Sequence, residues 1–144
     1  MTVVVVDANF SLAQVLPLPY SKDVVRRMGV WQSERPRILV PSLWEYEVVT
    51  GLRRACVQGL LRVDAVQETL DELLGMALQV LEATAERHRR ALVWAERLGQ
   101  ARAYDAQYLA LAEQTGAEMW TADERLYNRA QQVGASWVYW VGER

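Results

Sequence analysis

The feature of this chain that most constrains its fold is a run of four valines, Val3–Val6, that ends directly at Asp7. A strand with one face in water alternates apolar and polar residues, whereas a strand covered on both faces is apolar throughout, as in the centre of a parallel sheet. β-Branched residues also favour extended backbone. The run therefore predicts a central strand, with the Asp7 carboxylate emerging at its end.

Other strand-like segments alternate with helical ones along the rest of the chain. Apolar runs at 38–40, 77–81, 118–121 and 137–140 have the length of strands. Between them we expect helices that begin at or near Ser21, Ser42, Asp64, Thr84, Asp105 and Asp123. This alternation predicts an α/β fold, a three-layer α/β/α sandwich with a mostly parallel central sheet. With no internal repeat or linker, residues 1–144 are expected to form a single domain.

Composition narrows the class of protein without pointing to a partner. Hydrophobic residues make up 51% and charged residues 24% of the chain, as in an ordinary globular domain. The formal net charge of -2 gives no general attraction to nucleic acid, although every positive residue except Lys22 is arginine. The apolar run at the amino terminus is too short for a signal sequence or a membrane span, so a cytoplasmic location is expected.

The single cysteine and the single histidine do not suggest a nucleophilic site. Cys56 lies in an apolar helical pattern and is expected to be a small buried hydrophobe in a reducing compartment. His88 lies among charged residues on what should be a solvated helix face. A thiol nucleophile needs a nearby base, and this pattern does not supply one.

Four acidic residues stand where strand-like runs give way to helices or where helices begin: Asp7, Glu47, Asp105 and Asp123. In an open α/β sheet, ligand sites form in the crevice beyond the carboxyl ends of the strands, so residues distant in sequence can converge there. Oxygen ligands suit Mg²⁺ and Mn²⁺. The placement predicts a divalent-metal site.

Each of these acids also has a structural interpretation. Asp7 could form an Asx turn or cap the next helix, and Asp105 could cap its own helix or favour the positive end of the helix dipole. Independent caps would not all be expected at one end of one sheet. The joint pattern therefore favours function over capping.

The choice between Glu45 and Glu47 depends on a possible capping box. Ser42 and Glu45 have the spacing at which a serine and a glutamate satisfy each other's backbone N–H groups. Glu47 lies about 200° round the helix from Glu45, among apolar neighbours and one turn before Gly51, where another backbone could approach. We expect Glu47 to be the metal ligand, although a shared role for Glu45 stays open.

A second possible capping box surrounds the last acid. Thr121 and Glu124 have the same spacing as Ser42 and Glu45. If these two residues cap the following helix, Asp123 is left to face the crevice.

Four segments of the chain resemble the motifs of the PIN-domain ribonucleases, particularly the toxins of VapBC-type toxin–antitoxin pairs. The segments are Val-Val-Val-Val-Asp7-Ala8-Asn9, Val40-Pro41-Ser42-Leu43-Trp44 through Glu47 to Gly51-Leu52, Tyr104-Asp105-Ala106-Gln107-Tyr108-Leu109-Ala110-Leu111-Ala112, and Thr121-Ala122-Asp123. The resemblance covers nearly the whole chain, and the third segment is the closest match.

This resemblance implies a metal-dependent endoribonuclease. The family's four catalytic and metal-binding acids map onto Asp7, Glu47, Asp105 and Asp123, with Asn9 and Thr121 as supporting polar groups. It also implies a homodimer, a small antitoxin partner and an RNA substrate.

The expected chemistry is hydrolysis of an RNA phosphodiester with Mg²⁺ or Mn²⁺ as cofactor. Two divalent ions about 3.5–4 Å apart can activate water, neutralise the phosphate and relieve the leaving oxygen. In this hypothesis Asp7 and Asp105 anchor the principal ion, and Glu47 and Asp123 complete or bridge the site. Arg102 and Arg125 stand near two of these acids and are candidate contacts to the RNA backbone.

Other classes of protein fit less well. A phospho-acceptor receiver domain also places acids at strand ends, but its family uses a lysine on a late strand and Lys22 is the only lysine. A haloacid-dehalogenase-type phosphatase would need Asp at position 9, which is Asn9. No glycine-rich loop follows Val3–Val6, which argues against dinucleotide binding. A non-enzymatic binding module with an aromatic surface around Trp137 and Trp140 stays open as an alternative.

Overall fold

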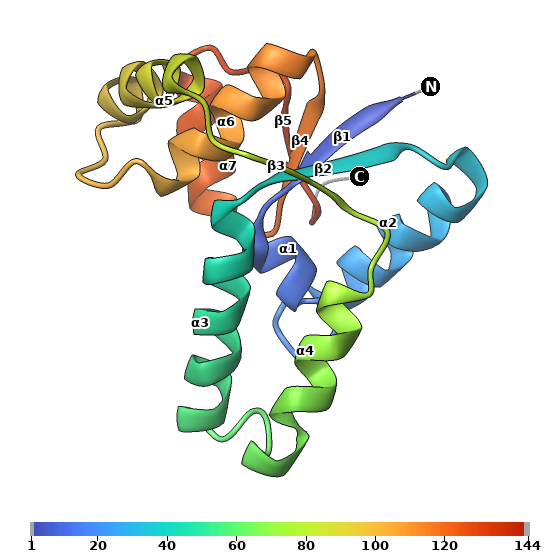
Figure 1. Cartoon of the computed structure of the whole chain (residues 1–144). Coiled ribbons are helices and arrows are strands. Elements are labelled where there is room, and N and C mark those ends of the chain that lie inside the picture. Colours follow the sequence, from blue (N-terminus) through green and yellow to red (C-terminus); the bar gives the residue numbers. More distant parts are fainter. Residues whose placement is uncertain (1, 143–144) are drawn as a thin grey trace.

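The computed structural model describes residues 2–142, and its centre is a five-stranded sheet in which each pair of neighbouring strands is parallel (Figure 1). The strands are β1 (Val3–Val6), β2 (Arg37–Pro41), β3 (Gln79–Leu81), β4 (Glu118–Thr121) and β5 (Val138–Trp140). Their order across the sheet is β3-β2-β1-β4-β5. The expectation of a mostly parallel α/β sheet is confirmed.

The valine run forms the central strand, as predicted. Val4 is fully buried and pairs in register with Ile38 of β2 on one side and Glu118 of β4 on the other. Val5 is also fully buried. A strand flanked by two others and covered on both faces has no exposed edge, which explains why its sequence is apolar throughout.

Helices cover both faces of the sheet. Their bounds are α1 (Ala8–Leu12), α2 (Ser21–Glu34), α3 (Leu43–Val57), α4 (Val66–Leu74), α5 (Ala85–Leu98), α6 (Tyr104–Thr115) and α7 (Glu124–Gln132), with a short 3₁₀ turn at Val63–Ala65. Helix α6 contacts β1, β2 and β4, and α5 packs on α6, whereas α2 lies on the opposite side of the sheet in Figure 1. The three-layer arrangement is the one that the sequence predicted.

The expected helix start at Ser21 is confirmed, whereas the one near Asp64 falls in the 3₁₀ turn that precedes α4. Asp64 lies inside the 3₁₀ turn and pairs with Arg62 (Nη2 to Oδ2, 2.8 Å), so the cap residue of α4 is Ala65. Ser21 is the first residue of α2 and not its cap; its hydroxyl donates to the Leu16 carbonyl and accepts from the Leu18 N–H. In both cases the side chain bonds to a neighbouring group and does not cap the helix.

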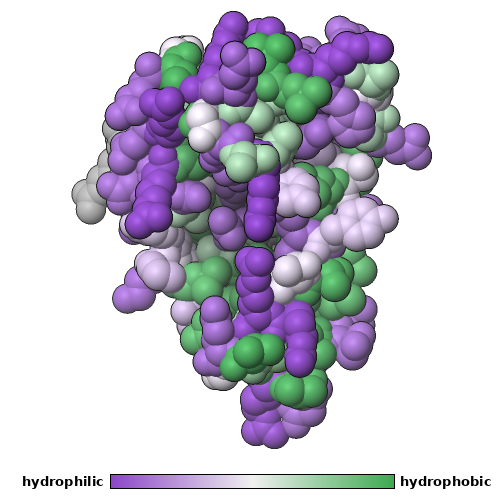
Figure 2. All heavy atoms as spheres, turned by 90° about the vertical axis from the view of Figure 1, so that its left-hand side faces the viewer, coloured by the Kyte–Doolittle hydropathy of each residue, from purple (hydrophilic) through white to green (hydrophobic). Residues whose placement is uncertain are grey.

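Helices α3 and α4 extend away from the sheet as a projecting pair (Figure 1). Figure 2 looks onto the side that carries α3 and α5, where apolar side chains are scattered among charged ones. Exposed apolar residues at the tip of the pair include Val57, Leu60 and Val63. Within residues 2–142, no helix is both long enough and apolar enough to cross a membrane.

Candidate active site

The strand order brings three of the four acidic segments to one end of the sheet. Asp7 follows β1 and Asp123 follows β4, and these two strands are neighbours. In the strand order, β2 and β3 lie on one side of β1, and β4 and β5 lie on the other. The order therefore reverses between β1 and β4, and ligands bind in such folds beyond the ends of the two strands at this switch point. Asp105 comes to the same place on the first turn of α6, which packs on β1.

Asp7 is buried and held by two hydrogen bonds. Its Oδ1 accepts from the Phe10 N–H (2.9 Å), which caps α1, and its Oδ2 accepts from the hydroxyl of Thr121. Burial is the main reason that the pKa of Asp7 is raised to about 7; the two hydrogen bonds lower the pKa, and nearby Asp105 and Asp123 raise it, and both contributions are included in this value. The ionised form of the Asp7 carboxylate is therefore destabilised at neutral pH, and a bound cation would stabilise it.

Glu47 reaches the same crevice from α3. The stripe Trp44, Val48 and Leu52 is buried, and the Trp44 indole N–H donates to the Ser11 hydroxyl at 2.9 Å, which fixes α3 against α1. Glu47 lies beside this stripe, half-buried, and accepts a hydrogen bond from the Tyr108 hydroxyl (2.7 Å). Burial raises the pKa of Glu47, and Asp105 raises it further.

The expected capping box at the start of α3 is wrong. Ser42 has helical backbone angles and makes no side-chain cap hydrogen bond. Glu45 is exposed and does not line the crevice, whereas Glu47 does. The geometry thus favours Glu47 over Glu45 for a reason other than the one that the spacing suggested.

Asp105 is half-buried at the start of α6. Its Oδ2 accepts from the side-chain N–H of Gln100 at 2.9 Å. Burial raises the pKa of Asp105, and Asp123 raises it further against the lowering effect of Gln100. The Gln100 Oε1 is buried and has no partner among the described residues, which adds an unpaired oxygen beside this acid.

Asp123, and not Thr121, caps α7. Its Oδ1 accepts from the N–H groups of Arg125 (3.0 Å) and Leu126 (3.2 Å), so the expected box between Thr121 and Glu124 is wrong. The Thr121 hydroxyl instead accepts from the Asp123 N–H at 2.9 Å and donates to Asp7. Thr121 therefore links two of the acids.

Two adjoining cavities lie at this end of the sheet. The first, which we call the acidic crevice, has a volume of about 320 Å³ and is lined by Asp7, Glu47 and Asp105. The second, the side pocket, has a volume of about 540 Å³ and contains Asp123 in its wall. Asn9 lines both. The four predicted acids are thus divided three to one between neighbouring cavities, with Asn9 at their junction.

The donor set fits a hard divalent cation. Its acids supply oxygen ligands only, which Mg²⁺ and Mn²⁺ prefer. The pKa values of Asp7, Glu47 and Asp105 are raised chiefly by burial and, to a lesser extent, by neighbouring carboxylates, and a bound cation would oppose both effects. Within residues 2–142, however, no three acidic, histidine or cysteine side chains stand close enough together to form a ready-made metal cage. Binding would need these side chains to draw together.

Sequence reasoning missed two residues that hold the acids. Tyr108 lies three residues after Asp105, so the two share a helix face, but its place in an apolar stripe suggested a core residue. Gln100 lies in the loop before α6, and its position gave no signal. Burial is the main cause that raises the pKa of Tyr108, and the neighbouring Glu47 and Asp105 raise it further.

Cationic and aromatic residues surround the crevice. Arg54 and Arg102 are exposed and line it, and Tyr46 and Tyr104 stand at its mouth with exposed fractions of 75% and 52%. Arg125, the other arginine predicted near the acids, lines the side pocket. The rim thus carries groups of the kind that bind phosphates and stack on bases.

A parallel α/β sheet with carboxylates beyond its switch point defines a class of domains that bind their ligands at that end of the sheet. The chain matches the PIN domain family over residues 4–132. Ribonuclease VapC3 of Pyrobaculum aerophilum is 34% identical over 124 residues, which cover 85% of this chain and 90% of that protein. The chain therefore belongs to the PIN-domain family, and it is a homologue of the VapC ribonucleases, as its motifs implied.

Solved structures share the fold. The crystal structure of PAE2754 from Pyrobaculum aerophilum aligns with a TM-score of 0.69 at 23% identity, over 98% of this chain and 92% of that one. A chain of a toxin–antitoxin complex from Klebsiella pneumoniae aligns with a TM-score of 0.65 at 16% identity, over 94% and 95%. At these identities the likeness concerns the fold alone.

Proposed function

We propose that this protein is a divalent-metal-dependent endoribonuclease that hydrolyses RNA phosphodiester bonds, and that it acts as the toxin of a toxin–antitoxin pair. The observation that carries the proposal is the convergence of Asp7, Glu47 and Asp105 on one crevice in a chain homologous to a VapC ribonuclease. Asp123 lies next to them and interacts electrostatically with Asp7 and Asp105.

In this proposal Asp7 and Asp105 hold the principal Mg²⁺ or Mn²⁺ ion, and Glu47 and Asp123 complete the set. When bound, such an ion supplies charge neutralisation at the phosphate and an activated water molecule. Four carboxylates without a counterion would repel the phosphate, so the apo site should bind RNA poorly. No side chain needs to form a covalent bond with the substrate.

The surrounding residues orient the acids. The Thr121 hydroxyl holds Asp7, the Tyr108 hydroxyl holds Glu47, and the Gln100 amide holds Asp105. Each bond favours the ionised carboxylate and fixes its direction. Arg54 and Arg102 at the rim are suited to the flanking phosphates of the RNA strand.

We also propose a small antitoxin protein as partner and a homodimer as the working assembly. The resemblance to VapC toxins supports both, and the Klebsiella pneumoniae structure that shares the fold is a toxin–antitoxin complex. Co-expression with the product of an adjacent reading frame, followed by size-exclusion chromatography with light scattering, tests the two assemblies together.

The ribonuclease proposal is tested by incubating the purified wild-type protein and Asp7→Asn with a mixed RNA pool in Mg²⁺, Mn²⁺ or EDTA. Cleavage should require the metal ion and Asp7. Metal-independent cleavage at the same sites, or equal cleavage by both proteins, would contradict the proposal.

The receiver-domain alternative has no support in the geometry. Lys22 is exposed on α2 and lines neither cavity, so it cannot contact a phosphoryl group on Asp7 in this arrangement.

A further inference from the structure

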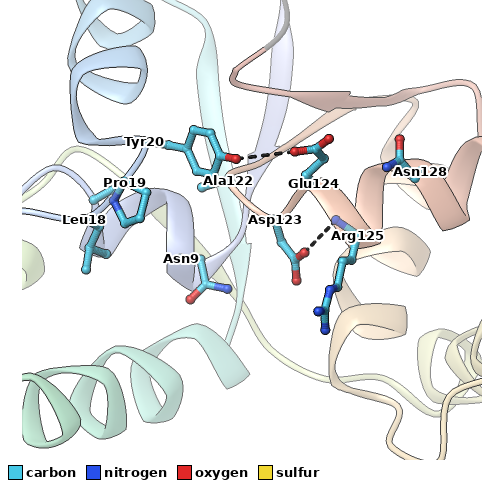
Figure 3. Close-up of a pocket in the computed structure, with 10 residues that line it drawn as sticks. Asn9, Leu18, Pro19, Tyr20, Ala122, Asp123, Glu124, Arg125 and Asn128 are labelled. Carbon is cyan, nitrogen blue, oxygen red and sulfur yellow. Dashed lines mark hydrogen bonds between the residues drawn. The ribbon is translucent and has the colours of Figure 1, made fainter. Parts of the chain in front are cut away.

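The side pocket lies between two segments that are far apart in sequence. The connection from α1 to α2, with Leu18, Pro19 and Tyr20, forms one wall, and the start of α7, with Glu124 and Asn128, forms the other (Figure 3). Its volume of about 540 Å³ is within the range of pockets that enclose small organic ligands. The mechanism proposed above leaves this space unused.

We propose that the side pocket is a subsite for the base of a nucleotide next to the phosphodiester that the acidic crevice cleaves. This inference rests on the proposed function and names the part of the substrate that would determine where the enzyme cuts. Tyr20 and Asn128 are then specificity-determining residues.

The first reason is the aromatic and apolar wall. Tyr20 is half-buried and its ring packs edge to face against Trp140, with ring centroids 5.3 Å apart, so its orientation is held from behind. Leu18 and Pro19 continue the same wall. Proteins that read single-stranded RNA stack unpaired bases on such side chains.

The second reason is the polar rim opposite that wall. The amides of Asn9 and Asn128 offer both donors and acceptors, and the Glu124 carboxylate accepts a hydrogen bond from the Tyr20 hydroxyl at 3.4 Å across the pocket (Figure 3). These groups suit the donor and acceptor edge of a base. Because a carboxylate only accepts, Glu124 favours bases with an exocyclic amino group, which uracil lacks.

The third reason is continuity with the site of cleavage. Asn9 lines both cavities and stands two residues after Asp7. A nucleotide whose phosphate lies among the acids can therefore place its base beside Asn9 without leaving the surface. The carboxylates of Asp123 and Glu124 in the wall disfavour an acidic peptide side chain as the occupant.

The test compares cut-site preference among pocket variants. Wild type, Tyr20→Ala, Tyr20→Phe and Asn128→Ala are incubated with randomised single-stranded RNA and Mn²⁺, and the cut ends are sequenced. Tyr139→Ala is the matched control, because Tyr139 is an exposed tyrosine on β5 that lines neither cavity. Melting temperatures establish that each variant is folded.

We expect wild type to prefer an amino-bearing base at one position beside the cut. Tyr20→Ala should lower kcat/KM for preferred sites by roughly ten- to a hundredfold, the usual effect of losing a stacking residue, and flatten the preference. Tyr20→Phe keeps the ring and should stay within about threefold of wild type. Asn128→Ala should mainly alter which base is preferred, and the control should match wild type.

The outcomes separate this inference from the proposed function. Active Tyr20→Ala and Asn128→Ala enzymes with wild-type cut sites would overturn the proposed base subsite but not the proposed ribonuclease activity.

If wild type cuts no RNA, the proposed function fails. Titration with AMP, CMP, GMP and UMP, followed by NMR, then tests whether the side pocket binds a base. The absence of chemical-shift changes at Tyr20 and Asn128 would overturn the base subsite. Variants that keep their cut sites but are no longer inhibited by the antitoxin would show that the side pocket binds a side chain of the partner, which would also overturn the base subsite.

Discussion

The acidic crevice and the side pocket lie at the same end of the sheet and share Asn9, yet their polar groups are held differently. In the crevice, Asp7 is almost fully buried and Glu47 and Asp105 are half-buried, each with a hydrogen bond from a neighbouring side chain. In the side pocket, Glu124 and Asn128 are exposed. Buried carboxylates interact more strongly with a cation or a reacting group, because little water screens them, and this suits catalysis. Polar groups that stay exposed to water are suited to recognition of a ligand.

The largest expected effect is the loss of cleavage in Asp7→Asn. The neutral amide cannot hold a cation as the carboxylate does, so cleavage of every site should fall by roughly a thousandfold or more. The residual cut-site preference should not change, because the side pocket is intact. Cleavage rates measured on the mixed RNA pool test both expectations. A variant that cut at the wild-type rate would show that Asp7 is not part of the catalytic site.

The same substitution should stabilise the fold at neutral pH. Since the pKa of Asp7 rises from 3.8 to about 7 on folding, the folded state keeps a proton that the unfolded chain loses between these values. The free energy of unfolding of wild type therefore falls as pH rises through this window and then stays level. Without metal, Asp7→Asn should be more stable by on the order of a few kcal/mol above pH 7 and nearly equal near pH 4.

Urea unfolding in EDTA between pH 4 and pH 8 measures this difference, with the exposed Asp71→Asn as control. Adding Mn²⁺ should then stabilise wild type more than Asp7→Asn, because only the native carboxylate site binds the ion. A stability difference that did not vary with pH would contradict the buried, proton-binding state of Asp7.

A smaller loss is expected from Tyr108→Phe. The substitution removes only the hydroxyl that holds Glu47, and loss of such a supporting hydrogen bond usually costs roughly ten- to a hundredfold in metal affinity or activity. Tyr104→Phe removes a hydroxyl from the exposed rim of the same crevice and is the matched control. Measuring the cleavage rate as a function of metal concentration distinguishes weaker ion binding from misfolding. Equal curves for the two variants would show that Tyr108 does not position Glu47.

The smallest effect is expected at the rim. Arg102→Ala should weaken RNA binding by about threefold to tenfold and reduce the slope of log affinity against log salt concentration by about 0.7, the value for one phosphate contact on a single strand. Cut-site preference should be unchanged, since a phosphate contact carries no sequence information. Arg53→Ala, which is exposed but lies outside the crevice, is the control in a filter-binding assay with Ca²⁺ in place of Mg²⁺.

Much of the fold could be predicted because its signals are local. The valine run predicted the central strand, and Thr84 predicted the start of α5, where its hydroxyl accepts from the Arg87 N–H. The same helix ends at Gly99, which has the left-handed φ of 69° that favours glycine. Cys56 is only half-buried, less than its apolar surroundings suggested. Local patterns thus fixed the elements better than the burial of single side chains.

The partners of the acids could not be predicted, because they depend on contacts between distant elements. The expected box between Thr121 and Glu124 is wrong for this reason, because the Thr121 hydroxyl donates to Asp7, which lies 114 residues earlier. The box at Ser42 fails locally, since Ser42 has helical backbone angles and makes no side-chain cap bond. Gly51 shows the same limit. It stands where a close approach was expected, but the neighbour is the side chain of Leu12 and not another backbone.

The pairing of β1 with β4 also sets the order in which the site can form during synthesis. Asp7 is made well before the strand beside it and its hydroxyl partner Thr121, which lies 114 residues later in the chain. A nascent or prematurely terminated chain therefore lacks an assembled crevice. A protein that cleaves RNA would thus stay harmless to the ribosome and message that are producing it until β4 has paired with β1.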